Sequence, residues 1–165
     1  MAQAVPATSA AIFQDWLDRT ADFVLAGNAD GFLASVEYPC LVATRTTQIV
    51  IAEAAEMRRG FQAWRDMMAG NGATMMVRTA RDATEIDADR IAGTYQTDLL
   101  HGATRVVPAF NSWMLLHRAG GEWRLAHLVS GLANRSYPFS VLQIGEDAPV
   151  LPPEITGADA PKPTH

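Results

Sequence analysis

Three side chains in the second half of the chain could together carry a proton to or from a small carbonyl compound. His127 stands in an apolar segment, and an imidazole, with an ordinary pKa of about 6.5, gains and loses a proton near neutrality. Tyr95 offers a phenol that can donate a hydrogen bond to a developing oxyanion. Asp82 offers a carboxylate whose pKa would rise in apolar surroundings. Together these residue types suit general acid–base catalysis.

The register of the strands decides which of these side chains share a face. Gly120-Gly121 suits a two-residue type I′ hairpin, which pairs Ala119 with Glu122. Because side chains alternate along a strand, counting from this turn puts His127 on the apolar face that we expect to be buried. The residues predicted for that face are Phe110, Ser112, Met114, Leu116, Trp123, Leu125, His127 and Val129.

A second turn, centred on Ala103-Thr104, would extend this face to the preceding strand. It would add Tyr95 and Thr97 and would set Tyr95 opposite Ser112. The phenol of Tyr95 and the imidazole of His127 would then look into one cavity.

The place of Asp82 stays open. A two-residue turn at Ala88-Asp89 points Asp82 inward, opposite Tyr95, whereas one residue more or less in the loop points Arg81 inward instead. A solvated charge on a strand is the alternative for Asp82, and a buried structural histidine with one polar partner is the alternative for His127.

The elements that must position these groups change in character along the chain. Helical spacing predicts an amphipathic helix capped by Ser9 and stopped at Gly27-Asn28, a short helix capped by Asp30 or Asn28 that ends before Pro39, and a helix over about 52–69. A small hairpin, Cys40 to Thr44 and Thr47 to Ile51, precedes the last of these helices.

Four long strands follow, over about 74–86, 90–101, 106–118 and 122–132. Helices at the front and a strand meander at the back predict an α+β domain. We expect a curled antiparallel sheet with three helices on its concave face, enclosing a cone-shaped ligand pocket. The predicted organisation is an extension over 1–8, the domain over 9–132 and a Pro-rich tail over 133–165.

Composition and charge exclude several function classes. The 13 Lys and Arg against 18 Asp and Glu give a net charge of -5, the wrong sign for binding nucleic acid or an anionic membrane surface. No apolar run approaches the roughly 20 residues of a membrane span, and the first residues lack the pattern of an export signal, so we expect a cytoplasmic protein.

The sequence shows no pattern typical of a metal site or a cofactor-binding site. Cys40 is the single cysteine, and a small buried apolar residue is favoured over a nucleophile there. The four histidines show no metal-ligand spacing, and no phosphate-binding glycine loop is present, so we expect no metal and no cofactor.

Local motifs resemble a known family over about residues 9–132. They are Asn28-Ala29-Asp30-Gly31 before the short helix, the Tyr38-Pro39 step into the hairpin, and Gly120-Gly121-Glu122-Trp123-Arg124-Leu125 at the last strand. With the order of elements, they make the chain similar to the nuclear-transport-factor-2-like superfamily, in its SnoaL-like branch related to polyketide cyclases and ketosteroid isomerases. The resemblance implies a cone-shaped fold with a pocket, frequent homodimers, and functions from isomerase, cyclase and dehydratase to plain binding or assembly.

Ketosteroid isomerase chemistry is disfavoured by the same resemblance. In those enzymes a base carboxylate directly precedes the proline after the short helix, and here that position is Tyr38. Their first helix also carries a tyrosine donor, where this chain has Phe13 and Trp16.

Two functional hypotheses from different classes remain. One is a cofactor-independent enzyme on a small apolar carbonyl or ring compound, with His127 moving the proton, Tyr95 binding the oxyanion and Asp82 assisting. The other is a non-catalytic binding or assembly module for a small apolar molecule. The expected pocket lining is Tyr38 near the mouth, with Trp16, Thr97, Phe110, Ser112 and Met114.

The opposite sheet face is expected to meet a second copy of the chain. Trp113, Leu115 and Leu128 would otherwise expose apolar area there, which predicts a homodimer. Asp98, Asn111 and His117 make that face polar as well as aromatic, and they are our second choice of functional residues.

Overall fold

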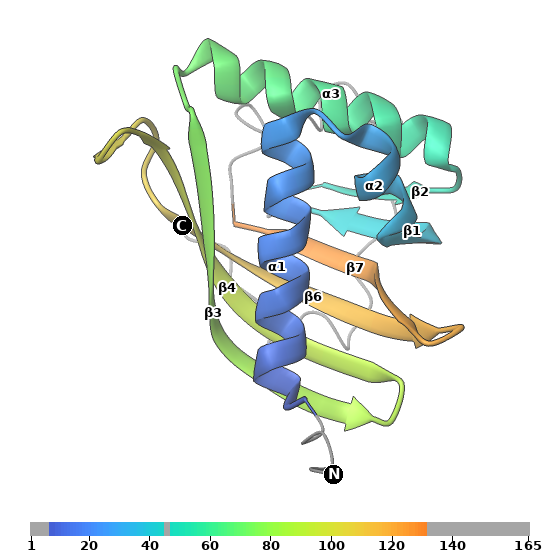
Figure 1. The fold of residues 1–165 in the computed structure, drawn as a ribbon. Helices are drawn as coiled ribbons and strands as arrows, with labels where there is room; N and C mark the ends of the chain where they lie inside the picture. The colour runs from blue at the N-terminus through green and yellow to red at the C-terminus, as the bar shows by residue number, and fades with distance from the viewer. Residues whose placement is uncertain (1–6, 45–46, 132–165) are drawn as a thin grey trace, which may run out of the picture.

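In the residues that the structure describes, the fold consists of three helices and seven strands, arranged as Figure 1 shows. The structure is a computed structural model that describes residues 7–44 and 47–131. In chain order the elements are α1 (Ser9–Ala26), α2 (Ala29–Ala34), β1 (Val36–Ala43), β2 (Gln48–Ile51), α3 (Ala54–Gly70), β3 (Met75–Asp87), β4 (Arg90–His101), β5 (Thr104–Arg105), β6 (Phe110–Ala119) and β7 (Glu122–Ser130). The predicted tail over 133–165 lies outside the described residues.

Side-chain caps and one glycine set the helix ends. Thr8, rather than Ser9, caps α1, and its Oγ1 accepts a hydrogen bond from the Ala11 N–H at 3.1 Å. Gly27 ends α1 with a φ of 71°, a conformation that favours glycine. Of the two candidates for the α2 cap, Asn28 holds the position, with its Oδ1 3.0 Å from the Gly31 nitrogen.

The strands form one curled sheet with the order β2-β1-β7-β6-β4-β3, and β5 pairs with β4. The three helices lie on its concave side (Figure 1), which confirms the predicted α+β class and layer order. One pairing differs from the expected antiparallel sheet, because β1 runs parallel to β7. The two strands of the β1–β2 hairpin run in opposite directions, and β1 is the one that lies beside β7. At the junction between α2 and β1, the Leu125 N–H donates to the Ser35 carbonyl at 2.9 Å.

The core fills the space between the helices and the concave face. Phe13, Trp16 and Leu17 of α1 are buried there against strand residues such as Tyr95 and Met114. Figure 1 shows α1 crossing the sheet in front of β3 and β4, while α3 closes one end. Burial of these large side chains is the main force that holds α1 to the sheet.

Polar contacts fix α1 on the edge strand β3. The Gln14 amide donates to the Arg78 carbonyl at 2.8 Å and accepts from the Ala80 N–H at 2.8 Å. The side chain of Gln14 therefore pairs with the backbone of an edge strand as a neighbouring strand would, and it satisfies groups that the edge leaves unpaired.

Three β-bulges interrupt the pairing of β3 with β4 and of β6 with β7. One of them leaves Ile86 as an extra residue between the pairs Glu85–Ile91 and Asp87–Arg90. In β3 the pair Ala80–Tyr95 is followed by the pair Asp82–Thr94, so Arg81 is the extra residue. In β7 the pair Leu125–Leu116 is followed by the pair His127–Leu115, so Ala126 is the extra residue. Beyond one bulge, the side chains lie on the face opposite to the one that simple alternation predicts, and the two bulges of β3 together restore the predicted face from Ala80 back to Met75.

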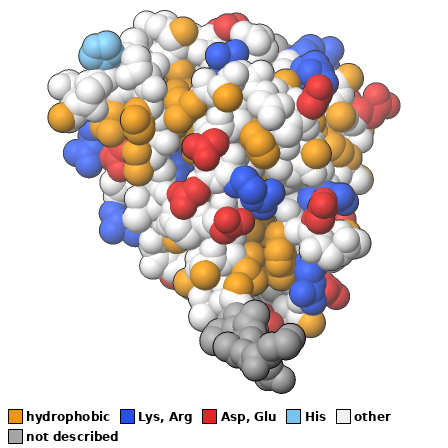
Figure 2. All heavy atoms as spheres, in the orientation of Figure 1, with side chains coloured by type: hydrophobic (Ala, Val, Ile, Leu, Met, Phe, Trp, Pro, Cys, Tyr) orange, Lys and Arg blue, Asp and Glu red, His pale blue; other side chains and the backbone are white. Residues whose placement is uncertain are grey.

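Other surface and core features match the sequence analysis only in part. Cys40 is fully buried, and burial raises the pKa of its thiol to about 12, so the prediction of a buried apolar residue is confirmed. In the part of the chain that the structure describes, no helix is long and apolar enough to cross a membrane. Acidic and basic side chains alternate over the helix-covered side rather than forming a patch of one sign (Figure 2).

Gly93 marks the closest approach of α1 and the bulge of β3 to β4. A Cβ there would lie 2.3 Å from the Asp82 carbonyl oxygen and 2.9 Å from the Phe13 ring. We predict that Gly93→Ala lowers the free energy of unfolding by about 1–3 kcal/mol, because the backbone must move to admit the methyl group. Chemical denaturation measures this loss.

Gly70→Ala is the matched control for that measurement. Gly70 ends α3, and a Cβ there meets nothing within 4 Å, so the control should unfold like the parent or slightly later. Equal stability of the Gly93→Ala and Gly70→Ala variants would contradict the close packing at Gly93.

Candidate ligand-binding site

The concave side of the sheet and the three helices enclose a cavity. The cavity has a volume of about 790 Å³, including its part open to solvent. Helix α3 contributes Phe61 and Trp64 to its wall, and the strands contribute residues such as Met76 and Leu128. The size and the apolar wall suit a small organic molecule.

Polar groups gather on one wall of this cavity. Tyr95 of β4, Ser112 of β6 and Ser130 of β7 are successive cross-strand partners, and all three line the cavity. Arg78 of β3 and Thr97 of β4 form the next pair along, and both also line it. A row of hydroxyls and one guanidinium therefore face an otherwise apolar space.

The Tyr95 side chain, whose phenol can titrate, is buried in this wall. Burial raises the pKa of its phenol, and the nearby Arg78 cation together with hydrogen bonds from Ser112 and Arg78 only partly opposes this rise. The phenol is consequently neutral at physiological pH and can act as a hydrogen-bond donor or acceptor, but not as a base.

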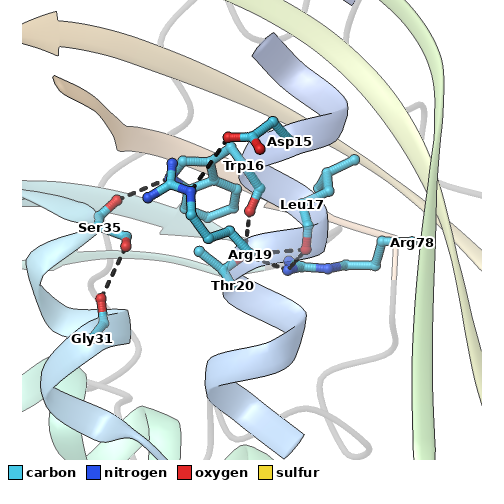
Figure 3. Close-up of polar contacts among 8 residues, drawn as sticks. All are labelled: Asp15, Trp16, Leu17, Arg19, Thr20, Gly31, Ser35 and Arg78. Carbon is cyan, nitrogen blue, oxygen red and sulfur yellow. Dashed lines mark hydrogen bonds and ion pairs between the residues drawn. The ribbon is translucent and has the colours of Figure 1, made fainter. Parts of the chain in front are cut away.

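Arg78 is held against α1 by hydrogen bonds and by aromatic rings. Its Nη2 donates to the Leu17 carbonyl at 2.6 Å and to the Thr20 hydroxyl (Figure 3). Its Cζ lies 5.7 Å from the centre of the Trp16 ring and 5.9 Å from the centre of the Tyr95 ring, both within the range of cation–π attraction. The positive charge is thus fixed at the cavity wall.

Trp16 lines the cavity from α1 and is fixed at its own polar end. The indole Nε1 donates to the Ser35 carbonyl at 3.2 Å (Figure 3), so the ring presents its apolar surface to the cavity. Among the described residues, the lining contains no Asp, Glu or His, and Arg78 is its one permanently charged side chain.

The prediction that His127 faces the concave side is wrong. The bulge at Ala126 turns His127 to the outer face, where its ring packs edge-on against Trp113 with the centres 5.6 Å apart. The same shift turns Leu128 and Ser130 into the cavity. His127 is 6% exposed, so it is a buried histidine on the side of the sheet away from the helices.

Asp82 is also displaced from its expected inward position. Because Ile86 is a bulge residue between the turn and Asp82, Asp82 pairs with Thr94 rather than with Tyr95. Its carboxylate accepts hydrogen bonds from the Thr94 hydroxyl at 2.6 Å and from the Thr94 N–H at 3.2 Å, in an exposed position. Neither Asp82 nor Arg81 lines the cavity.

Of the other residues predicted to line the cavity, all but Tyr38 do so. The cavity lining does include Trp16 of α1 and the strand residues Thr97, Phe110, Ser112 and Met114 together with Tyr95. The strand residues lie there because β4 and β6 pair with Tyr95 opposite Ser112, as predicted. Tyr38 is outside the lining, and its hydroxyl donates to the Leu33 carbonyl at 3.2 Å. Burial raises the pKa of Tyr38 to about 12.

Arg78 and Ser130 are site residues that the sequence analysis did not single out. Arg78 falls on the inward face when β3 is counted from the turn at 88–89, but a lone arginine in a strand gives no sign of a site. Ser130 becomes inward only through the bulge at Ala126.

The outer face carries the second group of candidate residues. The Asp98 carboxylate pairs with Arg105 at 2.6 Å and accepts from Gln96, and the His117 Nδ1 lies 2.9 Å from the Glu37 carboxylate. Arg105 and Gln96 hold the pKa of Asp98 below its ordinary value. Arg105 joins β5 to β4, and the His117–Glu37 pair joins β6 to β1 across β7. None of these residues lines the cavity described above.

The apolar groups proposed for a dimer interface are not all on that face. Leu128 lines the cavity, and Trp113 is only 5% exposed, packed with Ala43, Ala92 and Val129. The three residues therefore do not form the exposed apolar patch that the sequence analysis expected.

Comparison with known proteins identifies the fold. No protein-family model matches the chain, and no curated protein matches its sequence. A domain of unknown function with a cystatin-like fold from Nostoc punctiforme PCC 73102 matches with a TM-score of 0.60 at 12% identity, covering 79% of this chain and 82% of that one.

Two further solved structures agree with this match. An NTF-2-like protein of unknown function from Shewanella oneidensis MR-1 has a TM-score of 0.58 at 10% identity, covering 73% of this chain and 97% of that one. A ketosteroid isomerase-like protein from Erwinia carotovora atroseptica SCRI1043 has a TM-score of 0.56 at 14% identity, covering 74% and 95%. The protein thus has the nuclear-transport-factor-2-like, cystatin-like fold, and identities this low say nothing more specific.

We predict that His127→Gln acts on stability and not on ligand binding. The substitution removes the ring contact with Trp113 and should lower the free energy of unfolding by about 1–3 kcal/mol. His117→Gln is the control, because the partly exposed pair with Glu37 contributes about 0–1 kcal/mol. A His127→Gln protein that is as stable as the parent but no longer binds a ligand that the parent binds would contradict the outward placement of His127.

Proposed function

We propose that the protein binds a small, largely apolar carbonyl or ring compound in the concave cavity. The observation that carries the proposal is the single polar wall of Tyr95, Ser112 and Arg78 in an otherwise apolar cavity. A ligand can bury its apolar body against the helices and accept hydrogen bonds at an oxygen atom on this wall. The neutral phenol of Tyr95 is suited to donate one of those hydrogen bonds.

The lining favours binding over proton abstraction. General base catalysis needs a group that can take up a proton near neutrality, and no carboxylate or imidazole lines the cavity in the described ranges. His127 and Asp82, proposed for this role from the sequence, point elsewhere. The non-catalytic binding module is therefore the better supported of the two hypotheses.

An enzyme remains the second candidate because of the same polar wall. Tyr95, Ser112 and Arg78 would stabilise negative charge that develops on a carbonyl oxygen, provided that the substrate itself or water moves the proton. Turnover of a ligand that binds would distinguish the enzyme from the binding module.

Ligand screening by thermal unfolding tests the proposal. Small ring ketones, such as cyclohexanone and 1-indanone, should raise the melting temperature, because a ligand that binds only the folded state stabilises it. Tyr95→Phe keeps the ring and removes one donor, so it should weaken binding of these ketones about two- to tenfold.

Tyr38→Phe is the matched control for Tyr95→Phe. It also removes one phenol hydroxyl, but from a residue outside the cavity, and ketone binding should not change. Absence of any thermal response to ring compounds, or equal effects of the two substitutions, would argue against this cavity as the binding site.

We also propose that the protein is a homodimer and acts in the cytoplasm. The polar and aromatic outer face supports a second copy, although the apolar part of that face is smaller than the sequence analysis expected. Light scattering at micromolar concentration should give twice the chain mass. A monomer mass there would rule out the dimer.

A further inference from the structure

We infer that the ligand of the cavity is aromatic, and that the cavity selects an aryl ketone over the saturated ketone with the same carbon skeleton. This inference rests on the proposed binding function and narrows its ligand class. It starts from the residue types of the wall. Among the described residues, all three helices and two strands contribute aromatic side chains to the cavity lining, namely Trp16, Phe32, Phe61, Trp64, Tyr95 and Phe110.

The phenylalanine rings of this wall lie at an angle to their aromatic neighbours. The rings of Phe32 and Phe61 have centres 5.3 Å apart and an interplanar angle of 46°. The ring of Phe110 meets the ring of Trp64 nearly edge-on, with centres 6.4 Å apart and an interplanar angle of 67°. Because tilted rings direct edges and faces to different sides, the wall suits both the edge-to-face and the offset-stacked contacts by which aromatic rings attract a further ring.

Three methionines add to the apolar wall. Met57 of α3, Met76 of β3 and Met114 of β6 line the same cavity. The polarisable sulfur of a thioether attracts an aromatic ring. The wall therefore has two kinds of side chain whose attraction for an aromatic body exceeds the effect of apolar surface alone.

The spacing along the strands places such a body next to the polar wall. Tyr95 pairs with Ser112 and Thr97 pairs with Phe110, so Phe110 lies two residues from Ser112 along β6. Two residues of a strand span about 7 Å. A ketone whose oxygen accepts a hydrogen bond from Tyr95 would extend an attached ring over about this distance, toward Phe110. A carbonyl group bonded directly to an aromatic ring fits this spacing.

Hydrophobic burial alone predicts the opposite preference. A cyclohexyl group has more apolar surface than a phenyl group on the same skeleton, so transfer out of water favours the saturated ketone. Tighter binding of the aryl ketone would therefore report the contacts between aromatic rings, and not the apolar area that is buried.

Binding of two ketones to the unaltered protein is the primary test. Acetophenone and cyclohexyl methyl ketone would each be titrated while the methyl NMR signals of the methionines are followed. We expect acetophenone to bind about three- to tenfold more tightly. Equal affinities, or tighter binding of the saturated ketone, would overturn the inference and leave the proposed binding function standing. Absence of binding by both would also overturn the inference, and the thermal response to cyclohexanone would then decide the proposed function separately.

The same signals report where the aromatic ring binds. An aromatic ring current shifts the signal of a methyl group that lies against the ring, so acetophenone should shift signals of Met57, Met76 or Met114. Met75 is the internal control, because it neighbours Met76 on β3 but is 48% exposed and outside the cavity lining. Binding that shifts none of the three lining methionines would overturn the inference.

Substitution of Phe110 tests the placement of the ligand ring. Phe110→Leu keeps an apolar side chain and removes the ring beside the polar wall, so it should weaken acetophenone binding about two- to fivefold and leave cyclohexyl methyl ketone nearly unaffected. Phe23→Leu is the matched control, since Phe23 of α1 is also partly buried but outside the cavity, and it should keep the full preference. An unchanged preference in Phe110→Leu would contradict this placement. If Phe110→Leu fails to fold, the comparison of the two ketones on the unaltered protein still decides the inference.

Discussion

The contact between α1 and the edge strand β3 determines both the core and the cavity. Gln14 pairs with the backbone at Arg78 and Ala80, and Arg78 reaches back to Leu17 and Thr20. With α1 held there, its buried aromatic residues form one wall and the concave face of the sheet forms the other. The same arginine that holds the helix also lines the cavity, so the fold and the candidate site share one side chain.

Much of the fold follows from patterns that the sequence shows directly. Helical spacing before residue 70 and long alternating segments after it gave the layers, and the glycine turn at 120–121 gave the pairing of Ala119 with Glu122. The cavity position of Tyr95 and Ser112 agrees with the same counting. The pair Leu100–Arg105 and the pair Thr97–Phe110 differ in register by two residues, and a shift of two keeps each side chain on its predicted face. Local chemistry is sufficient wherever alternation is uninterrupted.

The site itself was only partly predictable, since each bulge reverses the faces beyond it. His127 and Asp82 both lie past a bulge, and both point away from the cavity. A signal for the bulge at Arg81 exists in Gly93, an isolated glycine within a strand, whose missing side chain admits the Asp82 carbonyl. The bulge at Ile86, which displaces Asp82 from its predicted partner, has no such signal. Ala126 gives no comparable signal, because alanine fits a regular strand as well as a bulge. The outward placement of His127 therefore needed the three-dimensional structure.

The parallel pairing of β1 with β7 has a consequence for how the chain completes its fold. Val36 pairs with Leu125, so β1, which pairs with β2 on one side, finds its partner on the other side only in β7, the last strand of the described residues. During synthesis on the ribosome, α2 and the β1–β2 hairpin emerge before β7. The side of β1 that pairs with β7 therefore stays unpaired until β7 has emerged. Such contacts between distant segments slow folding, because the intervening chain must be ordered before they form. The cavity is lined by α1, near the start of the described chain, and by β7, near its end. It can therefore form only after β7 is in place.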